Sequence, residues 1–224
     1  RSDSTLRGHY PLETVTLART LEESGERIDG EVLMPFFKEG GRFTIGDVHY
    51  VQEGAELTPA GDTEFARDKT FGYTSSDMKE YIEEKTQGAF RAADVVSISL
   101  DDIRAMRVDV IIKQLMAVTD FRKVIVNAVD YVDVKVFAIA MIRAMKAGKH
   151  FLFRTAAAWT KVIGGVTDKP LLRRDELVVP GNANGGLIII GSHVKKTTEQ
   201  FEKLRELDAV KFIEFNHLLV LDTP

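Results

Sequence analysis

The stretch KVIVNAVDYVDVKVFAIAMIRAMKAGKHFLFRT, residues 123–155, decides the fold. Residues 123–129 and 150–155 are short apolar runs typical of buried strands. Residues 133–148 carry apolar side chains at helical spacing and end at Gly148, a common helix stop. A strand, a helix and a strand of these lengths form a parallel unit with a right-handed crossover. The sequence therefore predicts an α/β fold with a mostly parallel sheet.

The same alternation continues on both sides of this stretch. The sequence predicts a helix that is capped by Ser75 or Ser76 and ends at Lys85, a strand at 94–100, one helix over 101–118 and another over 156–165. Helices between parallel strands pack on the two faces of the sheet. We therefore expect helices on both faces.

The N-terminal third is less regular. It predicts a strand at 31–37, a hairpin over 42–51 that turns at Gly46-Asp47, and an irregular functional loop over 52–73. Residues 11–24 predict a helix, because Leu12, Val15, Leu17, Ala18 and Leu21 lie at helical spacing.

The pattern changes at residues 165–186, which are rich in Gly, Pro and Asn and lack periodicity, so we interpret them as a linker. Residues 1–164 then form a first domain. Residues 187–224 predict a strand–loop–helix and two further strands, at 211–215 and 217–221, which is too little for a stable domain. We expect an internal fragment, with the start of its first domain missing and its second domain truncated.

Composition narrows the classes of function. The chain has 224 residues, a net charge of −4 and no cysteine. The charge argues against binding to nucleic acid or to anionic membranes. The absence of cysteine excludes disulfides and thiolate metal sites. No run approaches the roughly 18 apolar residues of a membrane span, and the five histidines are scattered without a metal-binding spacing. We expect a cytoplasmic protein without a metal site of its own.

Residues 2–8, SDSTLRG, are the first candidate site. Arg7 offers a planar fork for a carboxylate or a phosphate, and Gly8 lets the backbone approach a ligand closely. Asp3, Ser4 and Thr5 can bind sugar hydroxyls. The alternative is a helix-capping loop with a solvated arginine.

Three further stretches could bind anions. Gly41 and Arg42 follow a predicted strand, where open α/β sheets bind ligands, although a tight turn with an exposed arginine is equally compatible. Arg154 and Thr155 lie between a strand and a helix N-terminus, which is also the form of an ordinary capped connection. Gly191, Ser192 and Thr197 have the same strand–turn–helix form but lack the P-loop pattern.

In this order, these stretches resemble the four-carbon acid sugar kinase family, long catalogued as a domain of unknown function. SDSTLRG is similar to the family's D-S-T-x-R-G, which implies that Asp3, Ser4, Arg7 and Gly8 bind the sugar acid. Residues 34–51 resemble its Pro-then-Gly-Arg segment. The positions that match in this segment are Pro35, Gly41, Arg42 and Gly46. Thr63, Phe65 and Asp68 match the segment that follows it. In the family's nucleotide-binding motif, the matching positions are Gly191, Ser192, Thr197 and Gln200.

The resemblance implies a sugar-binding α/β domain followed by a nucleotide-binding domain. It implies an enzyme that uses ATP and Mg²⁺ to phosphorylate a hydroxyl of a small acid such as erythronate or threonate. Arg7, Arg42 or Arg154 would hold the carboxylate. Asp3 is a lesser candidate for the base, which we expect outside this chain, so the fragment alone would be inactive. A homodimer is compatible with these observations. So is the alternative to an enzyme, a non-catalytic module that binds sugar acids or has a regulatory role.

Overall fold

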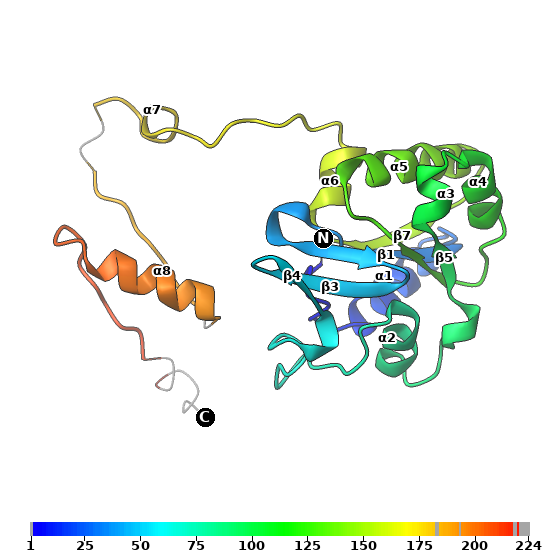
Figure 1. Ribbon diagram of the computed structural model, residues 1–224, viewed down its shortest axis with the longest axis horizontal. Helices are drawn as coiled ribbons and strands as arrows, with labels where there is room; N and C mark the ends of the chain where they lie inside the picture. Colours follow the sequence, from blue (N-terminus) through cyan, green and yellow to red (C-terminus); the bar gives the residue numbers. More distant parts are fainter. Residues whose placement is uncertain (1, 182–183, 193, 217–218, 220–224) are drawn as a thin grey trace. The chain divides into compact units, whose positions relative to one another are not determined.

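The computed structural model describes the chain apart from residues 1, 182–183, 193, 217–218 and 220–224 (Figure 1). The chain divides into two compact units, one ending at Asp168 and one beginning at Lys169. Each unit is described by itself below. In the described part of the chain, no helix has both the length and the apolar character that crossing a bilayer requires.

The first unit is built on a four-stranded parallel sheet in the order β5-β6-β1-β7. Its strands are β1 (Gly30–Met34), β5 (Val96–Ile98), β6 (Arg122–Val126) and β7 (Phe151–Thr155). The central strand β1 lies between β6 and β7, with Val32 opposite Val124 on one side and Phe153 on the other. The predicted parallel α/β fold is confirmed.

One face of the sheet is covered by α3 (Leu100–Arg104), α4 (Val108–Met116), α5 (Tyr131–Lys146) and α6 (Ala157–Ile163), which lie side by side in Figure 1. Val32, Val124 and Val126 point into this layer and join its core. The single helix predicted over 101–118 is wrong, because the chain breaks at Met106, whose φ is 54°. A positive φ cannot continue a right-handed helix.

The other face packs against α2 (Met78–Lys85) and the N-terminal loop. Leu33 and Ile125 point to this side and contact a second core that includes Tyr81 and Ile82. Strand side chains alternate between faces, which is why neighbouring residues of β1 and β6 belong to different cores. The N-cap of α2 is Asp77, which accepts from Lys79 N and Glu80 N, rather than the predicted serines.

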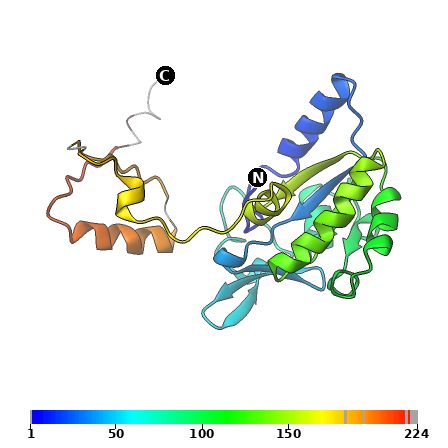
Figure 2. The same ribbon diagram turned by 90° about the horizontal axis from the view of Figure 1, so that it is seen from above.

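The predicted helix is confirmed as α1 (Leu12–Glu23), but most of its apolar side chains are not buried. Only Thr14 and Ala18 are buried, whereas Leu12 and Leu17 are 66% and 50% exposed. In Figure 2, α1 projects from the body of the first unit beside β7. Its apolar side therefore faces solvent over much of its length instead of a core.

A small antiparallel sheet lies beside the parallel one, made of β2 (Arg42–Ile45), β3 (Val48–Glu53) and β4 (Glu56–Pro59). The predicted hairpin is confirmed: Gly46 and Asp47 have φ values of 57° and 70°, as a two-residue primed turn requires. Strand β4 lies in the stretch predicted to be irregular. Thr44 and Ala128 exchange backbone hydrogen bonds, which attach the hairpin to the carboxyl end of β6.

The second unit contains α7 (Arg174–Leu177) and α8 (Lys195–Arg205). The predicted strands at 187–190 and 211–215 are not strands, because a single extended segment without a neighbour has no ladder to join. The predicted strand at 217–221 lies, apart from residue 219, outside the described residues. The described residues of this unit therefore do not form a second α/β domain.

Candidate functional site

The 2–8 loop begins at the carboxyl end of β7, where Ser2 N donates to Thr155 O at 2.8 Å. Its side chains bind one another. Asp3 Oδ1 accepts from Thr5 N at 2.7 Å, and Asp3 Oδ2 lies 3.3 Å from Arg7 Nη2. Arg7 Nε donates to Thr5 Oγ1 at 3.0 Å. Thr5 is buried, so its hydroxyl supports Arg7 and is not presented to a ligand.

Buried side chains hold this loop from inside the protein. Four consecutive carbonyl oxygens each accept from a different one: Ser4 O from His49 Nε2 at 2.9 Å, Thr5 O from Tyr73 Oη at 2.8 Å, Leu6 O from Tyr81 Oη at 2.7 Å and Arg7 O from Arg154 Nη2 at 3.2 Å.

His49 is the most enclosed of these donors. It lies on β3, and its Nδ1 is 3.0 Å from Thr44 Oγ1. Burial lowers the pKa of His49 to about 4. The neutral ring therefore donates through Nε2 to Ser4 O and accepts through Nδ1 from the threonine hydroxyl.

Arg7 and Arg42 meet at one aromatic ring. The guanidinium carbons of Arg7 and Arg42 lie 5.1 and 5.3 Å from the centre of the Phe65 ring. Both distances are within the range of cation–π attraction. Asp68, from the same loop as Phe65, lies 3.6 Å from Arg7 Nη1, and the N–H groups of Thr70 and Phe71 lower its pKa. Two arginines that are distant in sequence thus converge.

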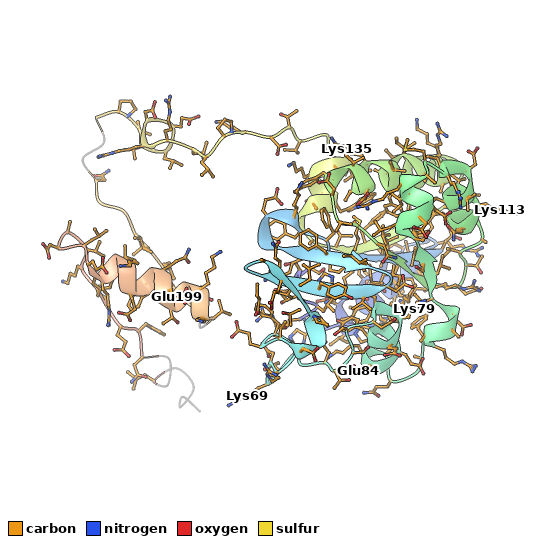
Figure 3. All side chains as sticks on the ribbon, viewed as in Figure 1. Lys69, Lys79, Glu84, Lys113, Lys135 and Glu199 are labelled. Carbon is orange, nitrogen blue, oxygen red and sulfur yellow. The ribbon has the colours of Figure 1, made fainter. Side chains whose placement is uncertain are left out.

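The loop that carries Phe65 is fixed at its far end by α2. Glu84, labelled in Figure 3, accepts from Thr74 N at 2.9 Å and from Ser75 N at 3.0 Å. Tyr73 adds its bond to Thr5 O from the same segment. The Phe65 ring is therefore held between the two arginines by a loop that is tied to α2 and to the 2–8 loop.

Arg42 differs from Arg7 in having no anionic partner. It forms no ion pair among the described residues, and its Nε is buried without a hydrogen-bond partner there. Its Nη1 donates to the carbonyl of Gly40. Gly41, with φ at 69°, and the paired backbone bonds between Phe37 and Arg42 fix its position. Burial lowers the pKa of Arg42, which reflects the cost of a charge with few partners.

Arg154 is placed differently from the sequence prediction. It is 4% exposed; its Nε donates to Glu13 Oε1 at 3.0 Å and its guanidinium lies over the Tyr10 ring at 4.8 Å. Together with its bond to Arg7 O, these contacts occupy the fork that a ligand carboxylate would need. Gly8, with φ at 130°, lets this pair approach, since a Cβ there would lie 3.3 Å from Arg154 Nη2.

A hollow of about 410 Å³ opens beside these groups and is lined by Ser2, Asp3, Arg7, Gly8 and Glu13. The structure therefore brings the predicted residues Asp3, Arg7 and Gly8 to one surface. Glu13 is an addition, because the sequence analysis predicted the helix that carries it but gave this helix no part in the site. Its position in the first turn of a helix, a few residues after Gly8, is the signal that could have found it.

A second hollow, of about 280 Å³, is lined by residues at the other end of the parallel strands. Its main charges are already paired: Asp29 accepts from Lys149 Nζ at 3.3 Å and from His150 N at 2.9 Å. It therefore offers a ligand less than the hollow at Arg7.

The predicted nucleotide residues all belong to the second unit. Gly191 and Ser192 precede α8, and Thr197 and Gln200 lie on it, with Thr197 Oγ1 donating to Ser192 Oγ at 3.0 Å. The first turn of α8 has no acidic residue and no side-chain cap. This environment is compatible with a phosphate. Among the described residues, no three acidic or histidine side chains are grouped as metal ligands would be.

The fold and the site define a class of protein, a parallel α/β domain with an arginine-lined hollow at the carboxyl edge of its sheet. Residues 1–163 match the model of a sugar-binding N-terminal domain. The chain therefore belongs to the family that carries this domain, which is the four-carbon acid sugar kinase family that its motifs resemble.

Solved structures with a similar fold come from three bacteria. A Haemophilus influenzae protein of the same family, described there as a domain of unknown function, is 17% identical with a TM-score of 0.51; the match covers 92% of this chain and 46% of that one. A Salmonella typhimurium protein described as a putative tRNA synthase is 13% identical, with a TM-score of 0.49 and coverages of 72% and 35%.

The third is a Bordetella bronchiseptica protein from the family of unknown function, described as a domain-swapped dimer with bound citrate. It is 21% identical with a TM-score of 0.48, and the match covers 70% of this chain and 33% of that one. No curated protein matches this chain. The chain spans less than half the length of these three proteins.

Proposed function

We propose that the first unit binds a small sugar acid, with Arg7 and Arg42 holding the carboxylate beside Phe65. The hollow at the 2–8 loop then takes the hydroxyl-bearing carbons, with Ser2, Asp3 and Glu13 as the polar groups that line it beside Arg7. Carboxylate oxygens are the natural acceptors for a guanidinium fork, and hydroxyl groups are natural donors to carboxylates.

The observation that carries this proposal is the state of Arg42. A half-buried guanidinium that forms no ion pair among the described residues is costly unless an anion completes it. Arg7 contacts the same Phe65 ring, but it already pairs with Asp3 and Asp68. The negative charge of a ligand is therefore most favourable close to Arg42. A ligand carboxylate supplies both the charge and the acceptor.

In the whole protein, we propose that this site presents a hydroxyl of a four-carbon acid, such as erythronate or threonate, to ATP. ATP with Mg²⁺ would supply the phosphoryl group, and Gly191, Ser192, Thr197 and Gln200 of the second unit would contact its phosphates. Both oxygens of Asp3 are engaged by Thr5 and Arg7, which favours a binding role for Asp3 and a base from elsewhere in the enzyme.

The binding proposal is tested by calorimetry on the full-length protein with erythronate, threonate and the uncharged polyol erythritol. We expect one of the acids to bind and erythritol not to bind. Arg42→Lys should weaken binding about ten- to a hundredfold, because an ammonium cannot reproduce the fork. Arg19→Ala, at an exposed arginine of α1, is the matched control and should bind like the wild type. Equal binding by Arg42→Lys would remove Arg42 from the site.

The kinase step is tested separately by ATP consumption with the acid that binds. Turnover supports the enzyme. If an acid binds at Arg7 and Arg42 but no ATP is consumed, the protein is instead a non-catalytic module that binds sugar acids.

A further inference from the structure

The 2–8 loop combines two features that seldom occur together. Leu6 has a φ of 66°, a conformation that a branched apolar residue rarely adopts, and its side chain is 1% exposed. Such a conformation persists only where the surroundings determine it strongly. The four carbonyl bonds from His49, Tyr73, Tyr81 and Arg154 are those surroundings.

These bonds also determine where the N–H groups of the loop point. The peptide bonds of the 2–8 loop are trans, and in a trans peptide the C=O and the N–H point in opposite directions. Each carbonyl that is turned inward to a buried donor therefore turns the next N–H outward. The peptide between Ser4 and Thr5 behaves in this way: Ser4 O accepts from His49, and Thr5 N donates to Asp3 Oδ1.

The next three N–H groups, those of Leu6, Arg7 and Gly8, donate no hydrogen bond within the described residues. Leu6 is buried, whereas Arg7 and Gly8 line the hollow, so the N–H groups of these two are the ones that a ligand can reach. Successive N–H groups around a residue with positive φ form a concave donor surface that suits an anionic oxygen. The side chain of Arg7 arises from the same segment, so these donors and its guanidinium serve one ligand.

We infer that His49, Tyr73, Tyr81 and Arg154 are positioning residues of the ligand site: they hold four consecutive carbonyls of the 2–8 loop, so that the N–H groups of Arg7 and Gly8 and the Arg7 side chain are presented to the sugar acid. This inference rests on the proposed function. It assigns the binding energy to donors that are oriented before the ligand arrives and lose little freedom when it binds.

Tyr10 supplies a matched control for the two tyrosines. It is 4% exposed in the same core, and its ring stacks on Tyr81 at 5.7 Å. Its hydroxyl has no hydrogen-bond partner in the described part of the chain. Tyr10→Phe, Tyr73→Phe and Tyr81→Phe thus remove the same atom from the same core, but only the last two release a carbonyl of the loop.

The test uses the full-length protein and measures calorimetric binding of erythronate and threonate together with melting temperature. Tyr73→Phe and Tyr81→Phe should each weaken binding about tenfold, the scale on which orienting groups act at binding sites. Tyr10→Phe should bind like the wild type. In wild-type protein, ligand should slow amide hydrogen exchange at Arg7 and Gly8, and this protection should be smaller in the two weakened variants.

The outcomes separate the two proposals. If Arg42→Lys loses binding while Tyr73→Phe and Tyr81→Phe bind like the wild type, the positioning role is overturned and the binding proposal stands. If Tyr10→Phe weakens binding as much as the other two, the effect belongs to the core and the inference is also overturned. If neither acid binds to the wild type, the proposed function fails first.

Discussion

At the scale of single residues, the site depends on charges that the protein leaves incompletely neutralised. Arg7 has Asp3 and Asp68 within 4 Å, whereas within the described residues Arg42 contacts the Phe65 ring and the Gly40 carbonyl and forms no ion pair. Arginine keeps its charge in proteins even where burial lowers its pKa, as it does here. The two arginines beside Phe65 are therefore unequally neutralised.

His49 makes folding stability depend on pH. Its pKa is about 4 in the folded protein and about 6.5 when unfolded. Below pH 6.5 the unfolded chain takes up a proton that the folded protein excludes, so stability falls as pH falls and the loss is complete near pH 4. The total is roughly 3 kcal/mol.

The measurement is urea unfolding of the wild type and His49→Gln between pH 7 and 4. The wild type should lose roughly 3 kcal/mol more than the variant over this range. His150→Gln, at an exposed histidine, should follow the wild-type curve. Parallel curves for the wild type and His49→Gln would contradict the assignment.

A second prediction concerns the buried pair of Glu31 and Lys123, whose charged atoms are 2.7 Å apart and fully buried. Lys123 Nζ also lies 3.5 Å from the centre of the Phe121 ring. Glu31→Leu alone should destabilise the protein by about 3–5 kcal/mol, because it leaves a buried ammonium unpaired.

The double variant Glu31→Leu with Lys123→Met should recover most of that loss, since apolar residues of similar volume replace such pairs at little cost. Urea unfolding of the three proteins measures both values. If the double variant is as unstable as Glu31→Leu, the attraction between the two charges is not what stabilises them.

At the scale of elements, the site is assembled mainly from connections. The 2–8 loop, the start of β2 with Arg42 and the loop with Phe65 meet beyond the carboxyl ends of β1 and β7. Glu84 on α2 and the Gly46-Asp47 turn fix these connections to regular structure. The rigid elements therefore set the distances, and the loops supply the chemistry.

The same truncation of a leucine should destabilise the protein strongly in α4 and only slightly in α1. Leu115→Ala, in α4 and fully buried, should cost about 2–5 kcal/mol because it leaves a cavity. Leu17→Ala, in α1 and 50% exposed, should cost less than about 1 kcal/mol. Urea unfolding of both variants checks this. A large loss for Leu17→Ala would show that the exposed side of α1 packs against something in solution.

The same pair shows what the sequence could predict. Apolar period located α1, α4, α5 and the strands of the parallel sheet, because local spacing follows the geometry of each element. The spacing of apolar residues did not reveal which helices bury their apolar side, since burial depends on which other elements pack against that side. It found Arg7 and Arg42 by chemical type, but missed Glu13, His49, Tyr73 and Tyr81, whose roles depend on contacts across 45 or more residues in three of the four cases.

At the scale of the molecule, both cores and the hollow belong to the first unit. The buried residues of the two cores end at Trp159, and the residues that line the hollow lie before residue 14. The second unit keeps Leu187 and Ile189 more than 80% exposed. The first unit thus contains both hydrophobic cores and the hollow of the proposed site, and we predict that it folds and binds by itself.

A chain that ends at Asp168 tests this. It should melt within about 3 °C of the 224-residue chain, because it retains every residue of both cores, and should bind the same acid with the same affinity. Differential scanning calorimetry and titration give both values. A much lower melting temperature would show that residues after 168 support the first unit.

The four side chains that grip the 2–8 loop come from positions 49, 73, 81 and 154. During synthesis, Arg154 is added about 150 residues after the loop that it holds. The loop therefore reaches its final set of contacts only once β7 has been made.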